Sequence, residues 1–341
     1  MSIALDATYS LDRQLTGVGV YSRQLLFGLA HAHPESQFTF AYRPHRFLRS
    51  FQDSLPKNAH RRLLLGKQTL SCELFHGLNQ RVDSTRYRRT VSTFHDLFVL
   101  TGDYSTSEFR QRFAAQARLA AQRSDLIIAV SAFTAGQVRD LLNVEPSRIR
   151  VVHHGVSPPT VPVPIARERL ILFTGSLQHR KNVLRLIEAF ERAAPPDWTL
   201  ILAGSTGFGA EEILQRAGQN QHIVVTGYVS NDELNRLYSR AALFAFPSLD
   251  EGFGMPVLDA MARGVPVLTS NKSALPEVAG DAALLVDPRS VDSIEAGLKK
   301  LIEDQALRTE LSTKGIERAG HFSWGKAVEE TWQVYCELLG R

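Results

Sequence analysis

The sequence predicts an α/β protein with two domains, each built on a parallel sheet. Short apolar runs without polar alternation recur along the 341 residues and alternate with helical segments, which is typical of strands buried on both faces. A proline-rich stretch, Val156–Pro164, separates two such series, because proline continues neither a helix nor a sheet. The length suits two domains of ordinary size.

The first half opens with a strand and a helix, and its later strands are short runs of three to six residues that are mostly apolar. The expected strands are Ile3–Leu5, Phe38–Tyr42, Leu74–His76, Thr90–Phe94 and Asp125–Val130. The expected helices are Gly19–His31 and Ser107–Arg123. His153 and His154 are expected in the turn that closes this domain.

The second half repeats the pattern with a fresh strand and glycine turn. Its expected strands are Leu170–Phe173, Thr199–Ala203, His222–Val225, Leu243–Phe246, Val265–Leu268 and Ala283–Val286. A final helix follows Phe322, with an apolar and aromatic stripe that indicates packing.

Charge is divided unevenly between the halves. Residues 1–165 carry 20 Lys and Arg against 12 Asp and Glu, whereas residues 166–341 carry 19 against 23. The basic half suggests an anionic partner, either a lipid diphosphate or a membrane surface, or else simply a solvated surface. Nucleic acid is not expected as a partner, because the chain has no zinc-finger spacing, RNP-type motif or long basic helix.

Cysteine usage and hydropathy predict a cytoplasmic protein. Cys72 and Cys336 are far apart and lack metal-ligand spacing, which favours a reducing compartment. Asp6 comes too early for a secretion signal, and no apolar run is long enough to span a bilayer. We therefore expect a cytoplasmic location, or a peripheral one on the inner face of the cell membrane.

The most informative segment runs from Asp250 to Leu268. It predicts a glycine-containing loop, a helix with proline in its first turn, and a buried strand. Glu251 precedes the helix and Asp259 lies within it. A helix N-terminus binds anions, and nearby carboxylates accept hydrogen bonds from hydroxyls. This combination suits a sugar nucleotide, although a capped helix with two solvated acids has the same pattern.

Three other segments contain residue types suited to a phosphate or sugar site. Arg180 and Lys181 come after a strand and Gly175, at the start of a predicted helix. Positive charge at a helix N-terminus is unfavourable because it opposes the helix dipole. An anion bound between the two side chains would remove this conflict. Gly17 and Gly19 stand at the first strand-to-helix turn, where glycines either line a phosphate or allow close packing. His95 follows a strand at its carboxyl end, where α/β sheets bind ligands.

The segment from Glu251 to Asp259 resembles the signature of family 4 retaining glycosyltransferases, two glutamates separated by seven residues. Asp259 stands where the family has the second glutamate and is one methylene shorter. The resemblance implies the GT-B fold, two Rossmann-like domains with parallel sheets facing across a cleft. It implies an acceptor domain at 1–160, a nucleotide-sugar donor domain at 165–320, and a C-terminal helix at 321–341 that crosses back to the first domain.

The same resemblance implies a role for each matching residue. Glu251 and His95 would lie beside the donor sugar, Asp259 would bind the ribose, and Arg180 and Lys181 would bind the diphosphate. Other donor-binding positions would be Gly175, Ser176, Gly227, Tyr228, Val229, Ser248, Gly252, Phe253, Gly254, Met255 and Pro256. The acceptor or phosphate loop would comprise Gly17, Gly19 and Tyr21, with His76 and Asn79 as weaker acceptor positions.

The resemblance is greatest to bacterial mannosyltransferases of polysaccharide synthesis. It implies a metal-independent hexosyltransferase that uses GDP-mannose, or else a UDP- or dTDP-sugar, as substrate and needs no cofactor. The expected acceptor is a saccharide, free or on a polyprenyl diphosphate. Three alternatives remain open: a nucleotide-sugar epimerase, a phosphorylase, for which no pyridoxal phosphate lysine is evident, and a non-catalytic GT-B binding subunit.

Overall fold

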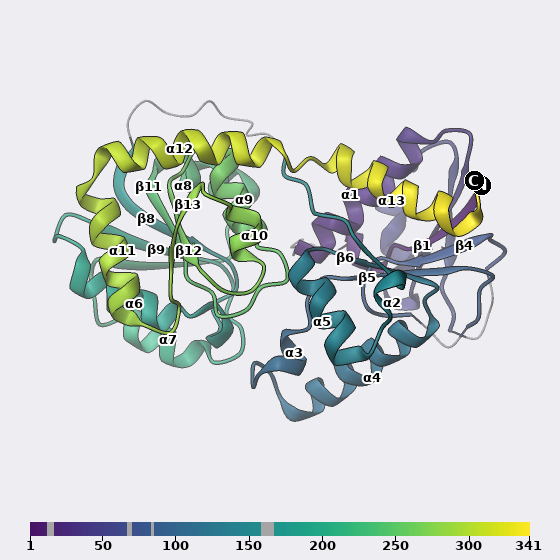
Figure 1. The fold of residues 1–341 in the computed structure, drawn as a ribbon, viewed down its shortest axis with the longest axis horizontal. Helices are drawn as coiled ribbons and strands as arrows, with labels where there is room; N and C mark the ends of the chain where they lie inside the picture. Colours follow the sequence, from purple (N-terminus) through teal and green to yellow (C-terminus); the bar gives the residue numbers. More distant parts are fainter. Residues whose placement is uncertain (12–16, 67–69, 83–84, 158–166) are drawn as a thin grey trace. The chain divides into compact units, whose positions relative to one another are not determined.

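A computed structural model describes residues 1–11, 17–66, 70–82, 85–157 and 167–341. The chain divides into two compact units. The N-terminal unit comprises Met1–Gly155 and Ser323–Arg341, and the C-terminal unit comprises Val156–Phe322 (Figure 1). The proline-rich stretch at the predicted boundary lies mostly outside the described residues.

The N-terminal unit contains a seven-stranded parallel sheet in the order β3-β2-β1-β4-β5-β6-β7. Its strands are β1 (Ser2–Asp6), β2 (Gln37–Tyr42), β3 (Ala59–Leu63), β4 (Leu74–Gly77), β5 (Thr90–Phe94), β6 (Leu126–Ala129) and β7 (Ile149–Val151). The strand order reverses between β1 and β4, which is the position where open α/β sheets bind ligands.

The helices and 3₁₀ turns described in this unit connect its strands, apart from α13, which comes last in the chain. They are η1 (Thr8–Leu11), α1 (Gly17–Ala32), α2 (Pro44–Phe47), η2 (Leu48–Gln52), α3 (Phe98–Thr101), α4 (Ser107–Arg123), α5 (Ala132–Leu142), η3 (Pro146–Arg148) and α13 (Trp324–Leu339). Side-chain hydroxyls of Thr106, Ser131 and Ser323 cap α4, α5 and α13 by accepting hydrogen bonds from backbone N–H groups.

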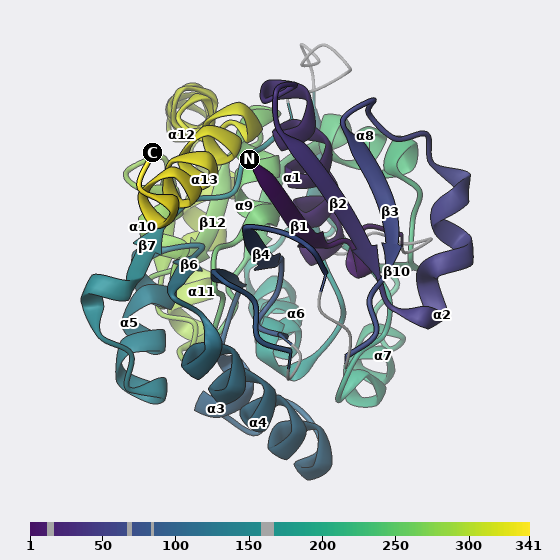
Figure 2. The same cartoon turned by 90° about the vertical axis from the view of Figure 1, so that its right-hand side faces the viewer.

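The last helix, α13, packs within the N-terminal unit against α1 (Figures 1 and 2). A β-carbon at Gly28 would come within 2.5 Å of the Val328 side chain, so only glycine allows this close approach. Trp332 stacks on His33 with ring centroids 3.6 Å apart. The aromatic stripe of this helix is therefore packing, as its sequence indicates.

The C-terminal unit contains a six-stranded parallel sheet in the order β10-β9-β8-β11-β12-β13. Its strands are β8 (Glu168–Thr174), β9 (Thr199–Ala203), β10 (Ile223–Gly227), β11 (Ala241–Phe246), β12 (Val267–Ser270) and β13 (Ala283–Val286). Its helices are η4 (His179–Lys181), α6 (Val183–Ala193), α7 (Ala210–Ala217), α8 (Asn231–Arg240), α9 (Met255–Ala262), α10 (Leu275–Ala279), α11 (Val291–Glu303) and α12 (Gln305–Gly320). The strand order reverses between β8 and β11.

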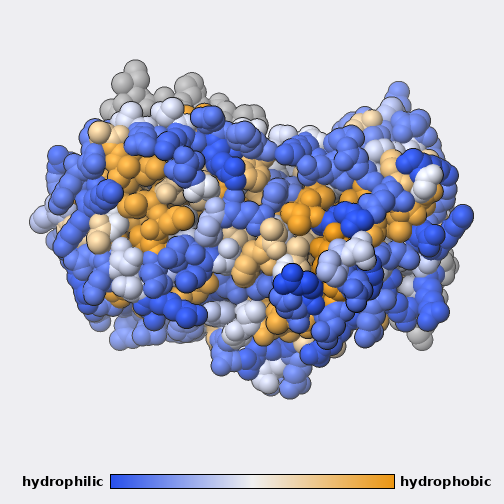
Figure 3. All heavy atoms as spheres, in the orientation of Figure 1, coloured by the Kyte–Doolittle hydropathy of each residue, from blue (hydrophilic) through white to orange (hydrophobic). Residues whose placement is uncertain are grey.

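On the face drawn in Figure 3, hydrophilic side chains cover most of the surface and apolar ones gather in smaller areas. Among the helices of the described residues, none is long and apolar enough to cross a membrane.

Candidate active site

A buried polar cluster of the C-terminal unit lies where its strand order reverses. Arg180 and Lys181 follow β8, and Glu251 follows β11, the neighbouring strand. The two strands are parallel, so their carboxyl ends meet at one edge of the sheet. Residues 70 positions apart in the chain are thereby brought into direct contact.

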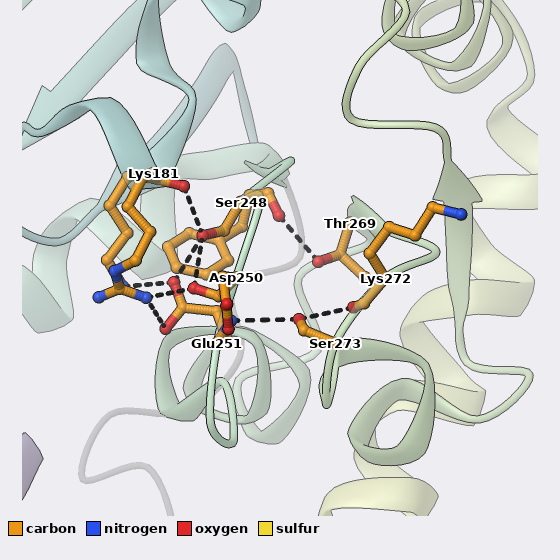
Figure 4. A network of polar contacts seen from close by, with 9 residues as sticks. Lys181, Ser248, Asp250, Glu251, Thr269, Lys272 and Ser273 are labelled. Carbon is orange, nitrogen blue, oxygen red and sulfur yellow. Dashed lines mark hydrogen bonds and ion pairs between the residues drawn. The ribbon is translucent and has the colours of Figure 1, made fainter. Parts of the chain in front are cut away.

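Glu251 accepts a hydrogen bond from Lys181 and forms an ion pair with Arg180 (Figure 4). Lys181 Nζ lies 2.5 Å from Oε1, and Arg180 Nη1 lies 3.0 Å from Oε2. Ser248 Oγ, 2.7 Å from Oε1, donates a further hydrogen bond. The sequence predicted an anion between Arg180 and Lys181. In the folded protein the carboxylate of Glu251 occupies that position.

All three charged side chains are nearly buried. Side-chain exposure is 9% for Glu251, 7% for Arg180 and 10% for Lys181. Burial alone would raise the pKa of Glu251, but the charges of Arg180 and Lys181 outweigh burial and lower this pKa to about 2. Glu251 is consequently ionised at any physiological pH and is unsuited to act as a general acid. The three side chains carry a net charge of +1.

The backbone of Glu251 is fixed by the loop before α10. Its N–H donates to Ser273 Oγ, 3.1 Å away, and its carbonyl accepts from the Ala274 N–H at 3.2 Å. Ser273 has φ of +57°, a left-handed conformation that costs energy for a residue with a β-carbon. Lys272, in the same loop, extends its amino group away from the cluster (Figure 4). Sequence reasoning missed Ser273, because a serine in a loop has no distinctive pattern.

Asn182 holds the β8 side of the cluster. Its side-chain amide donates to the carbonyls of Pro247 and Pro288, at 2.9 and 2.6 Å, and it too is left-handed, with φ of +61°. Lys181 lies over the Phe246 ring, with Nζ 4.8 Å from the centroid. The Arg-Lys-Asn run thus joins the ends of β8 and β11.

Asp259 stands one turn into α9 and is paired with Arg263, the residue that follows the end of this helix. Arg263 Nη1 lies 3.0 Å from Asp259 Oδ1, and the same guanidinium donates to Asn235 Oδ1 and lies over the Tyr238 ring. Burial raises the pKa of Asp259, and Arg263 opposes that change. One oxygen of the Asp259 carboxylate is therefore paired with Arg263, and a contact with ribose, as predicted, would be made by a carboxylate in that pair.

Two residues predicted to bind the donor have buried side chains that support the structure. Ser248 is fully buried and supports Glu251, as described above. Phe253 is also buried and packs edge-to-face on Phe322, with centroids 5.9 Å apart. The loop turns both side chains into the core, and the donor-binding role of these two positions stays a prediction.

The other predicted donor positions surround the same sheet edge as backbone or exposed groups. Gly254 has φ of +106° and precedes α9, where Met255 and Pro256 form the first turn and are partly exposed. Tyr228 is exposed after β10. The remaining positions are Gly175 and Ser176 after β8, Gly227 and Val229 beside Tyr228, and the buried Gly252.

In the N-terminal unit, Gly17 and Gly19 lie inside α1 and not in a loop before it. The helix begins at Gly17, two residues earlier than predicted. The expectation of a glycine loop is corrected to a glycine-containing first helical turn, whose N–H groups are those a helix leaves without intrahelical partners. Thr16, which precedes it, lies outside the described residues.

Tyr21, predicted for the acceptor or phosphate loop, and His76, predicted as a weaker acceptor position, are core residues, and their acceptor roles stay predictions. Both are fully buried. Thr93 Oγ1 lies 2.8 Å from Tyr21 Oη and 2.9 Å from His76 Nε2, and His76 Nδ1 lies 2.5 Å from Tyr335 Oη. Burial lowers the pKa of His76 to about 3, so it is neutral. This chain of hydrogen bonds ties α13 to β4, β5 and α1. Asn79 is half-buried and accepts from the Gln80 N–H.

His95 lies at the carboxyl end of β5, as predicted, but both of its ring nitrogens have protein partners. Nε2 is 3.0 Å from the carbonyl of Leu78, and Nδ1 is 3.4 Å from Nε2 of His154. A carbonyl only accepts, so His95 Nε2 carries the proton and Nδ1 accepts from His154. Burial lowers the pKa of His95 to about 4. His95 is a neutral histidine in a fixed tautomer, and His154, predicted only as a turn residue, is its partner.

Among the described residues, no group of three or more His, Cys, Asp or Glu side chains is placed to hold a metal ion.

Two family descriptions match the chain in succession. "Glycosyltransferase Family 4" matches residues 17–158, and "Glycosyl transferases group 1" matches residues 162–318. The chain belongs to the family 4 glycosyltransferases. It is 29% identical to O-antigen chain mannosyltransferase B of Escherichia coli over 96% of this chain and 98% of that protein. It is 28% identical to the serotype-specific mannosyltransferase WbdA of the same species over 74% of this chain, and spans 34% of WbdA.

Solved structures share the fold at low sequence identity. Sucrose-phosphate synthase from Thermosynechococcus elongatus superposes with a TM-score of 0.79 at 19% identity, covering 99% of each chain. HepE from Anabaena, solved with UDP and glucose, has a TM-score of 0.75 at 17% identity, over 99% of this chain and all of that one. The fold is GT-B, with two Rossmann-like units, and the protein is a glycosyltransferase.

Proposed function

We propose that this glycosyltransferase transfers a hexose to a saccharide acceptor with retention of anomeric configuration. Mannose is the first candidate for the hexose, with GDP-mannose as its donor. Two relatives support this choice: an O-antigen chain mannosyltransferase, matched over nearly its whole length, and a serotype-specific mannosyltransferase. The observation that carries the proposal is the buried cluster of Arg180, Lys181 and Glu251 at the point where the strand order reverses.

The proposed chemistry places the departing phosphate beside this cluster. The bond between the sugar's anomeric carbon and the β-phosphate oxygen breaks, and negative charge accumulates on the nucleoside diphosphate. Arg180 and Lys181 exceed Glu251 by one positive charge and are already fixed in place, so they stabilise that charge without reorganisation.

The acceptor hydroxyl then attacks from the face that the leaving group vacates, which preserves the anomeric configuration. Its proton passes to the departing phosphate, since Glu251 is held ionised by two cations and is a weak base. In this proposal Glu251 orients the cations and the sugar, and the diphosphate is a substrate group, so no cofactor or resident metal takes part.

The acceptor is proposed to be a growing saccharide, carried on a polyprenyl diphosphate. The excess of cations in residues 1–165 supports an anionic, lipid-linked substrate at or near a membrane. An epimerase would need no acceptor, so product analysis separates it from a transferase.

Donor choice is tested first by thermal shift with GDP, UDP, dTDP, ADP and their sugar conjugates, because a ligand of the folded state raises the melting temperature. We expect a shift with GDP and GDP-mannose. Transfer to a mannose-containing oligosaccharide is then followed by mass spectrometry, and the product's anomeric proton by NMR. A shift confined to another nucleotide would refute the GDP assignment, and an inverted product would refute retention.

Glu251→Ala is expected to abolish transfer while the protein stays folded. Lys272→Ala is the matched control, because Lys272 lies in the loop that holds Glu251 but its amino group extends away from the carboxylate (Figure 4). Near-normal transfer by Glu251→Ala would contradict the assigned role of Glu251.

A further inference from the structure

The arginine that follows α9 binds both the backbone and the side chain of Asp259. Arg263 Nη1 donates to the Asp259 carbonyl at 2.9 Å and to Asp259 Oδ1 at 3.0 Å. Side chains of a helix lean toward its N-terminus, so an arginine at the C-terminal end reaches back over the preceding turn. One guanidinium thus pairs with one of the last carbonyls of the helix and with the carboxylate of the same residue.

The guanidinium of Arg263 is itself fixed by α8. Nε and Nη2 both donate to Asn235 Oδ1, at 3.2 and 2.9 Å. The guanidinium carbon lies 5.0 Å from the centroid of the buried Tyr238 ring. The carbonyl of Arg263 accepts from Arg167 Nη2 at 2.8 Å. Both the side chain and the backbone of Arg263 are therefore held, and its charge is kept in one place by the protein's own groups.

Asp259 keeps one carboxylate oxygen for another partner. Arg263 pairs with Oδ1, and no donor from the described residues lies within hydrogen-bond distance of Oδ2. The Asp259 side chain is 35% exposed, against 16% for that of Arg263, so the carboxylate is accessible although it is paired. Burial raises the pKa of Asp259 and Arg263 opposes that rise. Arg263 therefore favours the ionised form, which accepts hydrogen bonds and donates none.

Tyr238 ties these residues to the sheet edge at which Glu251 lies. Its Oη is 3.0 Å from Oγ1 of Thr174, the last residue of β8, and 3.5 Å from the carbonyl of Pro256, in the first turn of α9. Glu251 stands in the loop that leads into α9, and Asp259 stands one turn inside the same helix. The two carboxylates are therefore presented by one continuous segment.

We propose that Arg263 is a positioning residue for recognition of the donor's ribose: it fixes the Asp259 carboxylate so that Oδ2 accepts a hydrogen bond from a ribose hydroxyl. Aspartate has only two side-chain torsions, so an ion pair to one oxygen is enough to orient the other. This inference deepens the proposed function and rests on it, because it takes the diphosphate to lie beside Arg180 and Lys181. The ribose is the next group along a nucleoside diphosphate, and hydroxyl donors bind carboxylates strongly.

The test measures how much the ribose hydroxyls contribute to nucleotide binding. Isothermal titration calorimetry gives the Kd of the full-length protein for GDP and for 2′,3′-dideoxy-GDP, and their ratio cancels any general loss of affinity. For the wild type we expect a ratio on the order of tenfold or more in favour of GDP. Arg263→Met removes the charge but keeps a long side chain, and should reduce the ratio to under about threefold. Arg263→Lys retains a cation and should recover part of the ratio.

A second variant leaves the ion pair in place. Asn235→Ala removes the acceptor that holds Nε and Nη2 of Arg263, and should reduce the ratio at least about twofold. Arg308→Met is the matched control, because Arg308 donates to the carbonyls of Leu301 and Ile302 and none of its contacts within the described residues involves Asp259. This control should keep the wild-type ratio.

Three results would overturn the proposal. The first is an equal fall of the ratio in Arg308→Met, which would show that the ratio follows general stability. The second is an unchanged ratio in both Arg263→Met and Asn235→Ala. The third is a ratio in Arg263→Lys no higher than in Arg263→Met, because a cation paired with Asp259 would then not be what supports recognition.

Binding by the wild type separates this inference from the proposed function. Equal affinity for GDP and 2′,3′-dideoxy-GDP would overturn the inference and leave the transfer reaction intact. If UDP, dTDP or ADP binds in place of GDP, the GDP assignment fails, and the ratio is measured with that nucleotide and its analogue without 2′- and 3′-hydroxyls. A wild type that binds none of these nucleotides would refute the proposed function, and this inference with it.

Discussion

Replacing Glu251 with glutamine is expected to destabilise the C-terminal unit, because two buried cations lose their carboxylate. Glu251 has a pKa of about 2 in the folded protein against an ordinary value of 4.5, a difference worth about 3 kcal/mol above both values. Loss of one partner of a buried ion pair has a similar cost of roughly 3–5 kcal/mol. We therefore expect Glu251→Gln to lower the free energy of unfolding by about 3 kcal/mol at neutral pH.

The pH dependence has a definite sign. The folded protein depresses the pKa of Glu251, so the stability it contributes is fully present above 4.5 and is lost as pH falls toward 2. Glutamine does not titrate. The difference in unfolding free energy between wild type and Glu251→Gln should thus be largest near neutral pH and should shrink on acidification below 4.5.

Urea unfolding at about pH 7 and about pH 3 measures both effects, with Trp198 reporting on the C-terminal unit. Glu168→Gln is the matched control, since Glu168 pairs with Arg240 at the surface and should contribute under about 1 kcal/mol. The Lys181→Met/Glu251→Gln double mutant should cost less than the sum of its parts. A loss below about 1 kcal/mol, or one that does not change with pH, would refute the reasoning.

Substitutions at three further positions test other parts of the structure. Ser273→Ala and Ser273→Gly both remove the hydroxyl that accepts a hydrogen bond from the Glu251 N–H, so both should lower kcat. Only glycine adopts the left-handed backbone without strain, so the glycine variant should have a higher melting temperature than the alanine variant. Asp259→Glu should preserve or raise activity if this position contacts ribose, whereas a severe loss would indicate that pairing with Arg263 requires the shorter side chain. Tyr335→Phe should cost about 1–3 kcal/mol in urea unfolding, because it leaves the partner ring nitrogen of a buried histidine unpaired; an unchanged midpoint would contradict that role.

The sequence was sufficient to predict most of the sheets. Strands buried on both faces are continuous apolar runs, so all but two strands were located along the chain, within a few residues at their ends. The two that were missed, β3 and β7, lie at the edges of the N-terminal sheet. Edge strands have one side open to solvent and tolerate charge, and the sequence Ala-His-Arg-Arg-Leu of β3 has no apolar pattern.

The local sequence also shows which residue types stand near a helix start, and on that basis it predicted Glu251, Arg180 and Lys181 as site residues. Residue spacing, however, does not say which groups neutralise one another. Only the parallel pairing of β8 and β11 brings the carboxylate between the two cations, and only the turn of the following loop buries Ser248 behind it.

The histidines show the same division. The sequence placed His95 at the end of a strand, and a strand end is a local property. Its tautomer depends on Leu78 and His154, and the burial of His76 depends on Tyr335, which is 259 residues away. A side chain's protonation and orientation follow from the groups that surround it in space, and the fold alone decides which groups those are.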